Sequence, residues 1–221
     1  MHETVLRELI QSGEVEELKL QKAAILAFDI EGASALHLAA EIGSVDVLSL
    51  FLEMGISLEK ECDLYYTPLQ VASMSGQLEA TKFLIKAGAK LSRKTETLNI
   101  LDFPAMYNDL PMFELLLAEG ADLFGSGVLR QPVFWAVQEG GFQVFSRFLD
   151  LGVPITVVQG PNFDENVSLL YVAASEGHLE IVRELLKRGA NLNVLTSEKV
   201  SAKMIANLYN HDLVVNELDL R

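Results

Sequence analysis

The sequence predicts an all-α solenoid in which helix-turn-helix units stack and β-hairpin-like loops join one unit to the next. The first observation is residues 168–193, where a short helix with small side chains, a glycine and a second, amphipathic helix follow one another. The second is a repeat, because Gly43 to Gly76 and Gly55 to Gly88 are steps of equal length. Two independent landmarks with one spacing indicate copies of a single unit, which must stack because one unit cannot bury its apolar side alone.

Each feature of residues 168–193 has a mechanical reason. Small side chains at Ala173 and Ala174 let a neighbouring helix approach closely, and Gly177 supplies the positive φ that ends the first helix. Gly189 ends the second helix in the same way. That second helix presents apolar side chains at the i, i+3, i+4 spacing of a buried face. They are Leu179, Ile181, Val182, Leu185 and Leu186.

Residues 1–28 are expected to form an N-terminal capping unit. Apolar side chains line one face of a first helix before Gly13, and a second helix starts within residues 15–20. Acidic residues in the first turn of that second helix suit the helix dipole. The apolar residues are Val5, Leu6, Leu9 and Ile10, and the acidic ones are Glu14, Glu16 and Glu17.

Two clear repeats follow, at residues 29–61 and 62–94. Ser34 and Thr67 are residue types that cap helix N-termini, and each stands directly before a first helix. Pro68 fits the first helical turn, where its missing N–H costs nothing. We therefore expect both first helices to begin immediately after these capping residues.

The third repeat, residues 95–126, is degenerate. Pro104 takes the place of the first small alanine, and a proline well inside a helix costs roughly 3 kcal/mol. This helix therefore either starts late or is kinked. Asn108 stands at the turn-glycine position, which asparagine tolerates better than most residues. The second helix is still clear, because apolar residues precede Gly120 at helical spacing.

The fourth and fifth repeats are residues 127–160 and 161–195. Trp135, the lone tryptophan, precedes the small residues of its helix, and we expect it to pack against neighbours. The connection at residues 153–167 is longer than its counterparts by roughly four or five residues. We expect it to form an extended finger or an ordered loop. Function concentrates in loops, although loops also tolerate insertions.

Residues 196–221 are expected to form a C-terminal capping unit. Lys203 replaces the leucine that other repeats bury, and Asn210-His211 stands where they have a glycine followed by a polar residue. Terminal units of a solenoid need a polar outer face, which explains this divergence. We therefore expect both ends to be capped and residues 1–221 to form a single domain.

The repeats resemble the ankyrin-repeat family, whose signature is T-P-L-H-x-A-A-x-x-G-H-x-x-x-V-x-x-L-L-x-x-G-A. The residues that carry the resemblance run from Thr67 to Ala72 and from Ser34 to Ala40, each followed by the turn glycines. The resemblance covers nearly the whole chain. It implies a structural role for His37 and His178, in place of catalysis or metal binding.

Composition excludes several classes of function. The net charge of −14, from 17 basic and 31 acidic residues, disfavours nucleic acid and anionic lipid and favours neutral or basic protein surfaces. We find no run of eighteen apolar residues and no signal-peptide pattern at the start. Cys62 is the only cysteine, so an internal disulfide is impossible. We expect a monomer in the cytoplasm or another reducing compartment.

No pattern of catalytic residues rises above background. The sequence has no Gly-rich phosphate loop with a lysine, no H-E-x-x-H and no cysteine cluster, so we expect no catalytic residue, cofactor or metal. Two alternatives to a binding module stay open. One is an enzyme whose site lies at the 153–167 loop and the degenerate third repeat. The other is a purely structural spacer.

The family resemblance implies a non-enzymatic module that binds a partner protein, as an adaptor, an inhibitor or an effector. Binding would use a concave face made by hairpin tips and first helices. Aromatic and methionine residues at its centre with an acidic rim match the composition of protein interfaces. The residues expected to contact the partner are Glu31, Glu41, Asp63, Leu64, Tyr65, Tyr66, Met74, Glu96, Met106, Tyr107, Arg130, Gln138, Glu139 and Glu176.

Overall fold

The chain folds into short helices and loops, which confirms the predicted all-α class. The structure is a computed structural model, and it describes residues 1–91, 99–124, 131–156 and 167–220. The chain divides into two compact units, unit 1 at residues 1–91 and unit 2 at residues 92–221. Its further division into capping units and repeats within a single domain stays a prediction.

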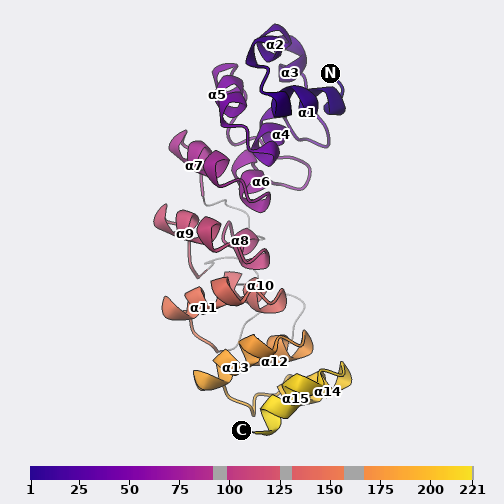
Figure 1. Ribbon diagram of the computed structural model, residues 1–221, viewed down its shortest axis with the longest axis vertical. Helices are drawn as coiled ribbons and strands as arrows, with labels where there is room; N and C mark the ends of the chain where they lie inside the picture. The colour runs from indigo at the N-terminus through magenta and orange to yellow at the C-terminus, as the bar shows by residue number, and fades with distance from the viewer. Residues whose placement is uncertain (92–98, 125–130, 157–166, 221) are drawn as a thin grey trace. The chain divides into compact units, whose positions relative to one another are not determined.

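The helices of unit 1 are α1 (Glu3–Ser12), α2 (Val15–Leu20), α3 (Lys22–Leu26), α4 (Ala35–Ile42), α5 (Val45–Glu53), α6 (Pro68–Met74) and α7 (Leu78–Lys86). They stand in two layers (Figure 1). In one layer α4 packs against α6, and in the other α5 packs against α7. Helix α1 covers α4 and helix α2 contacts α5, so the N-terminal residues close one side of this stack.

The helices of unit 2 are α8 (Asp102–Met106), α9 (Leu110–Ala118), α10 (Pro132–Gln138), α11 (Phe142–Asp150), α12 (Leu169–Ser175), α13 (Leu179–Lys187), α14 (Ala202–Leu208) and α15 (Asp212–Asp219). The first helices α8, α10, α12 and α14 pack in that order, and the second helices α9, α11, α13 and α15 follow the same order. The core lies between the layers and includes Phe113 and Phe148, whose rings meet edge to face at 4.7 Å.

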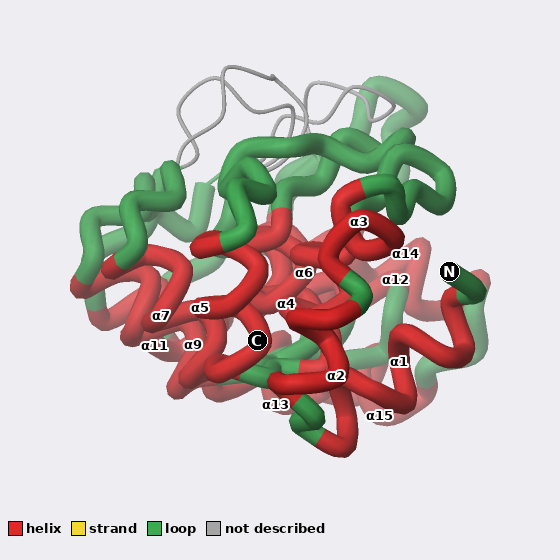
Figure 2. The backbone as a smooth tube through the Cα atoms, turned by 90° about the horizontal axis from the view of Figure 1, so that it is seen from above, coloured by secondary structure: helices red, strands yellow, loops and turns green. Residues whose placement is uncertain are grey.

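Loops that join successive repeats run along one edge of each unit, beside the first-helix layer (Figure 2). Within the described residues, antiparallel pairing in these loops is limited to isolated bridges, Ile30 with Ala33 and Leu195 with Ser201. The arms between repeats are therefore turns held by few backbone bonds.

The predicted capping residues start their helices. Gln70 is three residues past Thr67; its Oε1 accepts the Thr67 N–H at 3.0 Å, and Thr67 Oγ1 accepts the Gln70 N–H at 3.4 Å. At α4 the His37 Nδ1 accepts the Ser34 N–H at 3.0 Å. Each bond satisfies a backbone donor at the helix start, which otherwise has no intrahelical partner.

His37 has the structural role that the family resemblance implies. Because its Nδ1 accepts the Ser34 N–H, its Nε2 carries the proton and donates to the Tyr66 carbonyl at 3.0 Å. The ring is 3% exposed. Burial lowers the pKa of His37 below its ordinary 6.5, and the bond to the Tyr66 carbonyl opposes this shift more weakly. The imidazole is therefore neutral and ties α4 to the next hairpin.

Unit 1 should lose stability in mild acid because of His37. The unfolded chain binds the His37 proton at a higher pH than the folded chain, so stability falls as pH drops through and below the ordinary value of 6.5. Glutamine is the residue at the same position of α6. Replacing His37 by Gln therefore keeps an acceptor for the Ser34 N–H, and it removes the dependence of stability on pH that His37 causes. Urea unfolding followed at the α4 amides by NMR, at about pH 5 and pH 7.5, measures the effect. An unchanged slope in H37Q would contradict the assignment.

The third repeat accommodates Pro104 because its first helix, α8, starts late. Helix α6 begins one residue after its capping position Thr67, whereas α8 begins three residues after the equivalent Asn99. Pro104 is consequently the third residue of α8, in the first turn, where the backbone N–H has no intrahelical acceptor to lose. The kinked-helix alternative is excluded.

The third repeat also buries a carboxyl group. Asp102 stands where His37 and Gln70 stand in unit 1, and its Oδ2 accepts the Asn99 N–H at 2.8 Å. Asp102 is 1% exposed, and its Oδ1 has no hydrogen-bond partner in the part of the chain that the structure describes. Burial raises the pKa of Asp102 to about 7, although the bond from Asn99 acts in the opposite direction.

The last repeat carries a polar pair at its end. Lys203 occupies the position where α12 buries Leu170, and its Nζ pairs with a carboxylate oxygen of Asp219. The side chain of Lys203 remains half exposed. The pair makes this part of the α14 surface polar, where α12 has a buried leucine.

Candidate functional site

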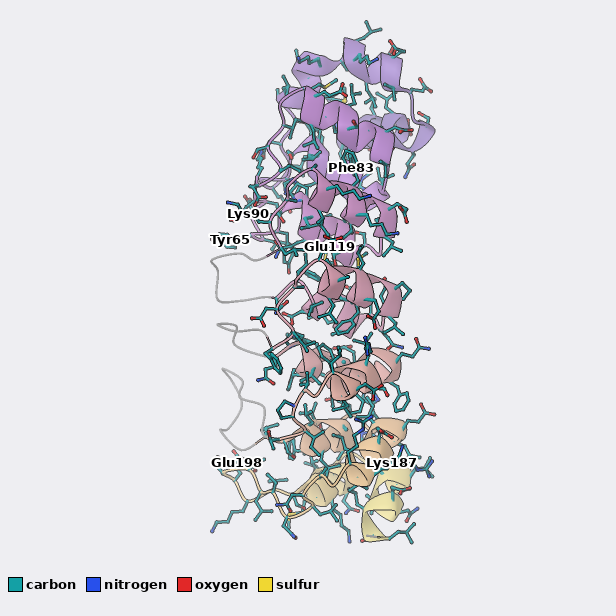
Figure 3. The ribbon with its side chains drawn as sticks, turned by 90° about the vertical axis from the view of Figure 1, so that its left-hand side faces the viewer. Tyr65, Phe83, Lys90, Glu119, Lys187 and Glu198 are labelled. Carbon is teal, nitrogen blue, oxygen red and sulfur yellow. The ribbon has the colours of Figure 1, made fainter. Side chains whose placement is uncertain are left out.

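The hairpin tip at residues 62–66 contains four of the predicted contact residues, and Asp63, Leu64 and Tyr65 are exposed there. The Cys62 N–H donates to the Tyr66 carbonyl at 3.0 Å, and the Tyr65 N–H donates to the Cys62 carbonyl at 2.8 Å. Between these bonds Tyr65 adopts φ +64°, the left-handed conformation that bulky residues rarely take. Leu64 is 71% exposed and Tyr65 is 66% exposed. Figure 3 shows Tyr65 at the loop edge of unit 1, well away from Phe83 on α7.

Neighbouring hairpins of unit 1 fix this tip. The Asp63 N–H donates to the Glu31 carbonyl at 2.8 Å, and His37 Nε2 donates to the Tyr66 carbonyl. Gly32 lies directly beneath, since a Cβ there would be 2.6 Å from Asp63 Oδ1. Glu31 and Asp63 are both exposed, so two carboxylates lie beside the Leu64–Tyr65 pair.

The first-helix ends of unit 1 are less available than the tip. Glu41 accepts hydrogen bonds from both terminal nitrogens of Arg7, at 3.1 and 2.9 Å, so its carboxylate is engaged by a guanidinium that also pairs with Glu3. Met74 is half-buried at the end of α6, and Tyr66 is half-buried beside the tip. Among the predicted contact residues of unit 1, the exposed side chains are therefore those of the hairpins, namely Glu31, Asp63, Leu64 and Tyr65.

Unit 2 brings five predicted residues to the ends of its first helices. Met106 and Tyr107 lie at the end of α8, Gln138 and Glu139 at the end of α10, and Glu176 at the end of α12. Tyr107 is 63% exposed, Glu139 and Glu176 are exposed, and Met106 and Gln138 are half-buried.

Sequence reasoning missed Leu208 and Tyr209, which stand at the same place on α14. They are 69% and 57% exposed, and each follows its counterpart, Ser175 or Glu176, by one repeat. The period that revealed the repeats would also have revealed them. They were overlooked because residues 196–221 were interpreted only as a cap.

Side-chain bonds hold these helix ends in register. His178 Nε2 donates to the Gln138 carbonyl at 2.9 Å, and His211 Nε2 donates to the Ser175 carbonyl at 2.9 Å. Both rings pass over a turn glycine of the preceding repeat; a Cβ at Gly140 would lie 2.7 Å from His178 Cε1. His178 thus has the structural role that the resemblance implies.

The junction between the end of α8 and the start of α11 uses a different bond. The turn residue there is Asn108, at φ +53°, and its Oδ1 accepts the Val144 N–H at 3.1 Å. Gly141 occupies the place of His178, and a Cβ there would lie 3.0 Å from the Ala105 carbonyl. Asparagine therefore supplies the contact between repeats that a histidine supplies elsewhere.

Two predicted contact residues, Glu96 and Arg130, lie outside the described residues. So do residues 157–166 of the predicted 153–167 loop. The partner-contact set as a whole stays a prediction, because the geometry shows which side chains are exposed without showing what they touch.

The described residues offer no grouping of His, Cys, Asp and Glu side chains suited to a metal ion. Within them we also find no helix with the length and apolarity needed to cross a membrane. Cys62 is half-buried and has a free thiol. Trp135 is half-buried and its ring meets Phe134 edge to face at 5.7 Å, which confirms packing.

Comparison with known proteins identifies the repeat type. A family model described as ankyrin repeats (3 copies) matches residues 2–95 and again residues 100–196. Together the two matches cover most of the chain.

The curated proteins that this chain resembles are longer than the chain itself. A transient receptor potential cation channel subfamily A member 1 homolog of Caenorhabditis elegans is 32% identical over 133 residues, which are 52% of this chain and 11% of that protein. A probable E3 ubiquitin-protein ligase, XBOS32, of Oryza sativa subsp. japonica is 28% identical over 169 residues, which are 75% of this chain and 32% of the ligase. The chain spans about a third or less of these relatives.

The ankyrin repeat domain of human ASB11 has the same fold. Its crystal structure aligns with a TM-score of 0.77 at 23% identity, over 95% of this chain and 96% of that one. At this identity the likeness shows the fold alone.

Proposed function

The chain belongs to the ankyrin-repeat family, and on that premise we propose that it is a non-enzymatic module that binds a partner protein through its hairpin tips and first-helix ends. Ankyrin repeats are generally protein–protein interaction modules, and the fold is typically a non-enzymatic scaffold. The concave-face site and the choice between adaptor, inhibitor and effector belong to this proposal.

The observation that carries the proposal is the exposed Leu64–Tyr65 pair, held on a turn in which Tyr65 is left-handed. A left-handed backbone costs a residue with a side chain roughly 1–2 kcal/mol, a cost that glycine does not incur. At Tyr65 this cost accompanies an exposed aromatic ring beside an exposed leucine. Lys199 has the same backbone conformation in an equivalent turn, so the feature that distinguishes the 62–66 tip is its exposed apolar pair. A large apolar pair held out on a turn supports contact with another protein, because aromatic anchors dominate interface energies.

Tyr65→Gly should stabilise the fold by about 1 kcal/mol and weaken partner capture. Glycine relieves the left-handed strain, and little buried contact is lost because the ring is exposed. Two measurements test this. The midpoint of urea unfolding reports stability, and immobilised wild type and variant are compared for the proteins that each captures from a lysate of the native cell. Leu64→Ser should weaken capture without raising stability.

Lys199→Gly is a matched control in unit 2. Residues 196–200 form the same turn, with the Thr196 N–H bonded to the Val200 carbonyl at 3.1 Å and the Lys199 N–H to the Thr196 carbonyl at 2.8 Å. Lys199 also has a left-handed φ, +63°. K199G should stabilise in the same way and retain the captured proteins. If Y65G and L64S retain them as well, the tip is not an interface.

A further inference from the structure

Four exposed side chains form a row on the first helices of unit 2. The row consists of Tyr107, Glu139, Glu176 and Tyr209, each directly before the left-handed residue that ends its helix. Helices α8, α10, α12 and α14 pack in sequence, and equivalent positions on neighbouring repeats face the same way. Neighbouring helices pack roughly 8–10 Å apart, so successive members of the row are about 10 Å apart.

The spacing of the row is fixed by contacts between repeats. His178 bonds to the carbonyl of Gln138, the residue before Glu139, and His211 bonds to the carbonyl of Ser175, the residue before Glu176. The two carboxylates are thus attached to backbone positions that neighbouring repeats hold in place. Such preorganisation lowers the entropy cost of binding.

The charges of the row are uncompensated. In the part of unit 2 that the structure describes, Glu139 and Glu176 have no ion-pair partner. Three arginines of unit 2 pair instead with carboxylates of the second-helix layer: Arg147 with Glu114 at 2.5 Å, Arg188 with Asp150 at 2.8 Å, and Arg183 with Glu217 at 2.7 Å. The row is therefore a local negative surface with an exposed tyrosine at each end.

We propose that the row binds a basic segment of a partner protein, with one cationic side chain on each of Glu139 and Glu176 and flanking residues against Tyr107 and Tyr209. This inference rests on the proposed function and names the partner chemistry of unit 2. Charge complementarity selects the occupant, because a basic segment compensates both carboxylates and its cations can also lie over the tyrosine rings. Seven residues of α-helix rise roughly 10 Å, so cations seven apart match the carboxylate spacing.

The probe is an alanine-rich helical peptide carrying two arginines seven residues apart, titrated into the full chain at low salt and followed by NMR. Shift changes should concentrate at the amides of the four row residues. Added salt should weaken the affinity, because exposed charge pairs are screened. A peptide with its arginines three residues apart should bind several-fold more weakly.

Glu139→Gln with Glu176→Gln should weaken binding roughly fivefold to tenfold, as expected for two exposed ion pairs. The matched control is Glu119→Gln with Glu180→Gln, which changes the net charge equally at the second-helix layer, where Glu119 follows α9 (Figure 3). It should leave the affinity unchanged. All four side chains are exposed, so the fold is retained.

The inference is overturned if the control pair weakens binding as much as the row pair, or if arginine spacing has no effect. It is also overturned if the row amides shift with protein concentration alone, since a second copy would then occupy the row. Partner capture that still depends on Leu64 and Tyr65 would in each case leave the proposed function standing.

Discussion

Asp102→Asn is expected to stabilise unit 2 by about 2 kcal/mol above neutral pH. The substitution removes the free-energy cost of ionising a buried carboxyl group, and it adds the smaller cost of burying an unpaired amide N–H. The wild-type carboxyl is buried, and its pKa rises from 3.8 to about 7. At 1.36 kcal/mol per unit, ionising it in the folded state costs roughly 4 kcal/mol. Asparagine keeps an acceptor for the Asn99 N–H and cannot ionise. The new amide N–H group is itself unpaired, which offsets about 1–3 kcal/mol of this gain.

The sign of the pH dependence follows from proton binding. Between pH 3.8 and about 7 the folded chain holds the Asp102 proton and the unfolded chain has released it. The contribution of Asp102 to stability is therefore full below this window and is lost as pH rises through it. His37 in unit 1 has the opposite slope, because burial lowers its pKa.

Urea unfolding followed at α10 and α12 amides, in mild acid and above neutral pH, tests this prediction. D102N should remove the decline that the wild type shows on raising the pH. Glu119→Gln is the control, because that carboxylate is exposed in the same repeat. Equal pH slopes for the wild type and D102N would show that Asp102 does not titrate as described.

Gly140→Ala should destabilise unit 2 by about 2–4 kcal/mol, combining backbone strain with the loss of a hydrogen bond. The left-handed backbone, φ +76°, is strained for alanine by roughly 1–2 kcal/mol. The new methyl would also lie 2.7 Å from His178 Cε1, so the ring must move and its bond to the Gln138 carbonyl is lost. Leaving the part-buried Gln138 carbonyl unpaired adds roughly 1–2 kcal/mol, toward the lower end of the cost for a buried group.

Gly152→Ala separates the two costs. Gly152 has φ +84°, and apart from its chain neighbours no atom of the described residues would lie within 4 Å of a Cβ there, so only backbone strain remains. G152A should cost about 1–2 kcal/mol. In a His178→Ala background, G140A should add only a similar amount, because the ring is already absent. Calorimetric or urea unfolding of the four variants measures this cycle. Equal costs for G140A and G152A in the wild-type background would show that the histidine contact contributes nothing.

The fold was predictable because its signals are local. The repeat period, the turn glycines and capping residues such as Thr67 act within a single unit, and each appears in the structure where the sequence places it. The late start of α8 was one of two stated alternatives. The sequence could not decide between a late start and a kink, because a proline is tolerated at any position of a first turn. The backbone of the structure shows where the first turn of α8 lies.

The candidate site was only partly predictable. The exposed tip residues Leu64 and Tyr65 and the acidic pair Glu139 and Glu176 were named from register alone. Glu41 was named by the same rule, yet in the structure its carboxylate is bonded to Arg7 of α1. Tyr209 was missed, although the repeat register places it at the same position as Glu139 and Glu176.

By itself, the sequence determined an all-α solenoid, the order of its repeats and the family to which the chain belongs. Each follows from spacing within one repeat and from its recurrence along the chain. Only the tertiary structure decided that Tyr65 is held in a left-handed turn, that Glu41 pairs with Arg7, and that Asp102 is buried without a partner for Oδ1 among the described residues. The physical reason is that strain, ion pairing and desolvation depend on neighbours brought from other repeats, which no pattern within one repeat can specify.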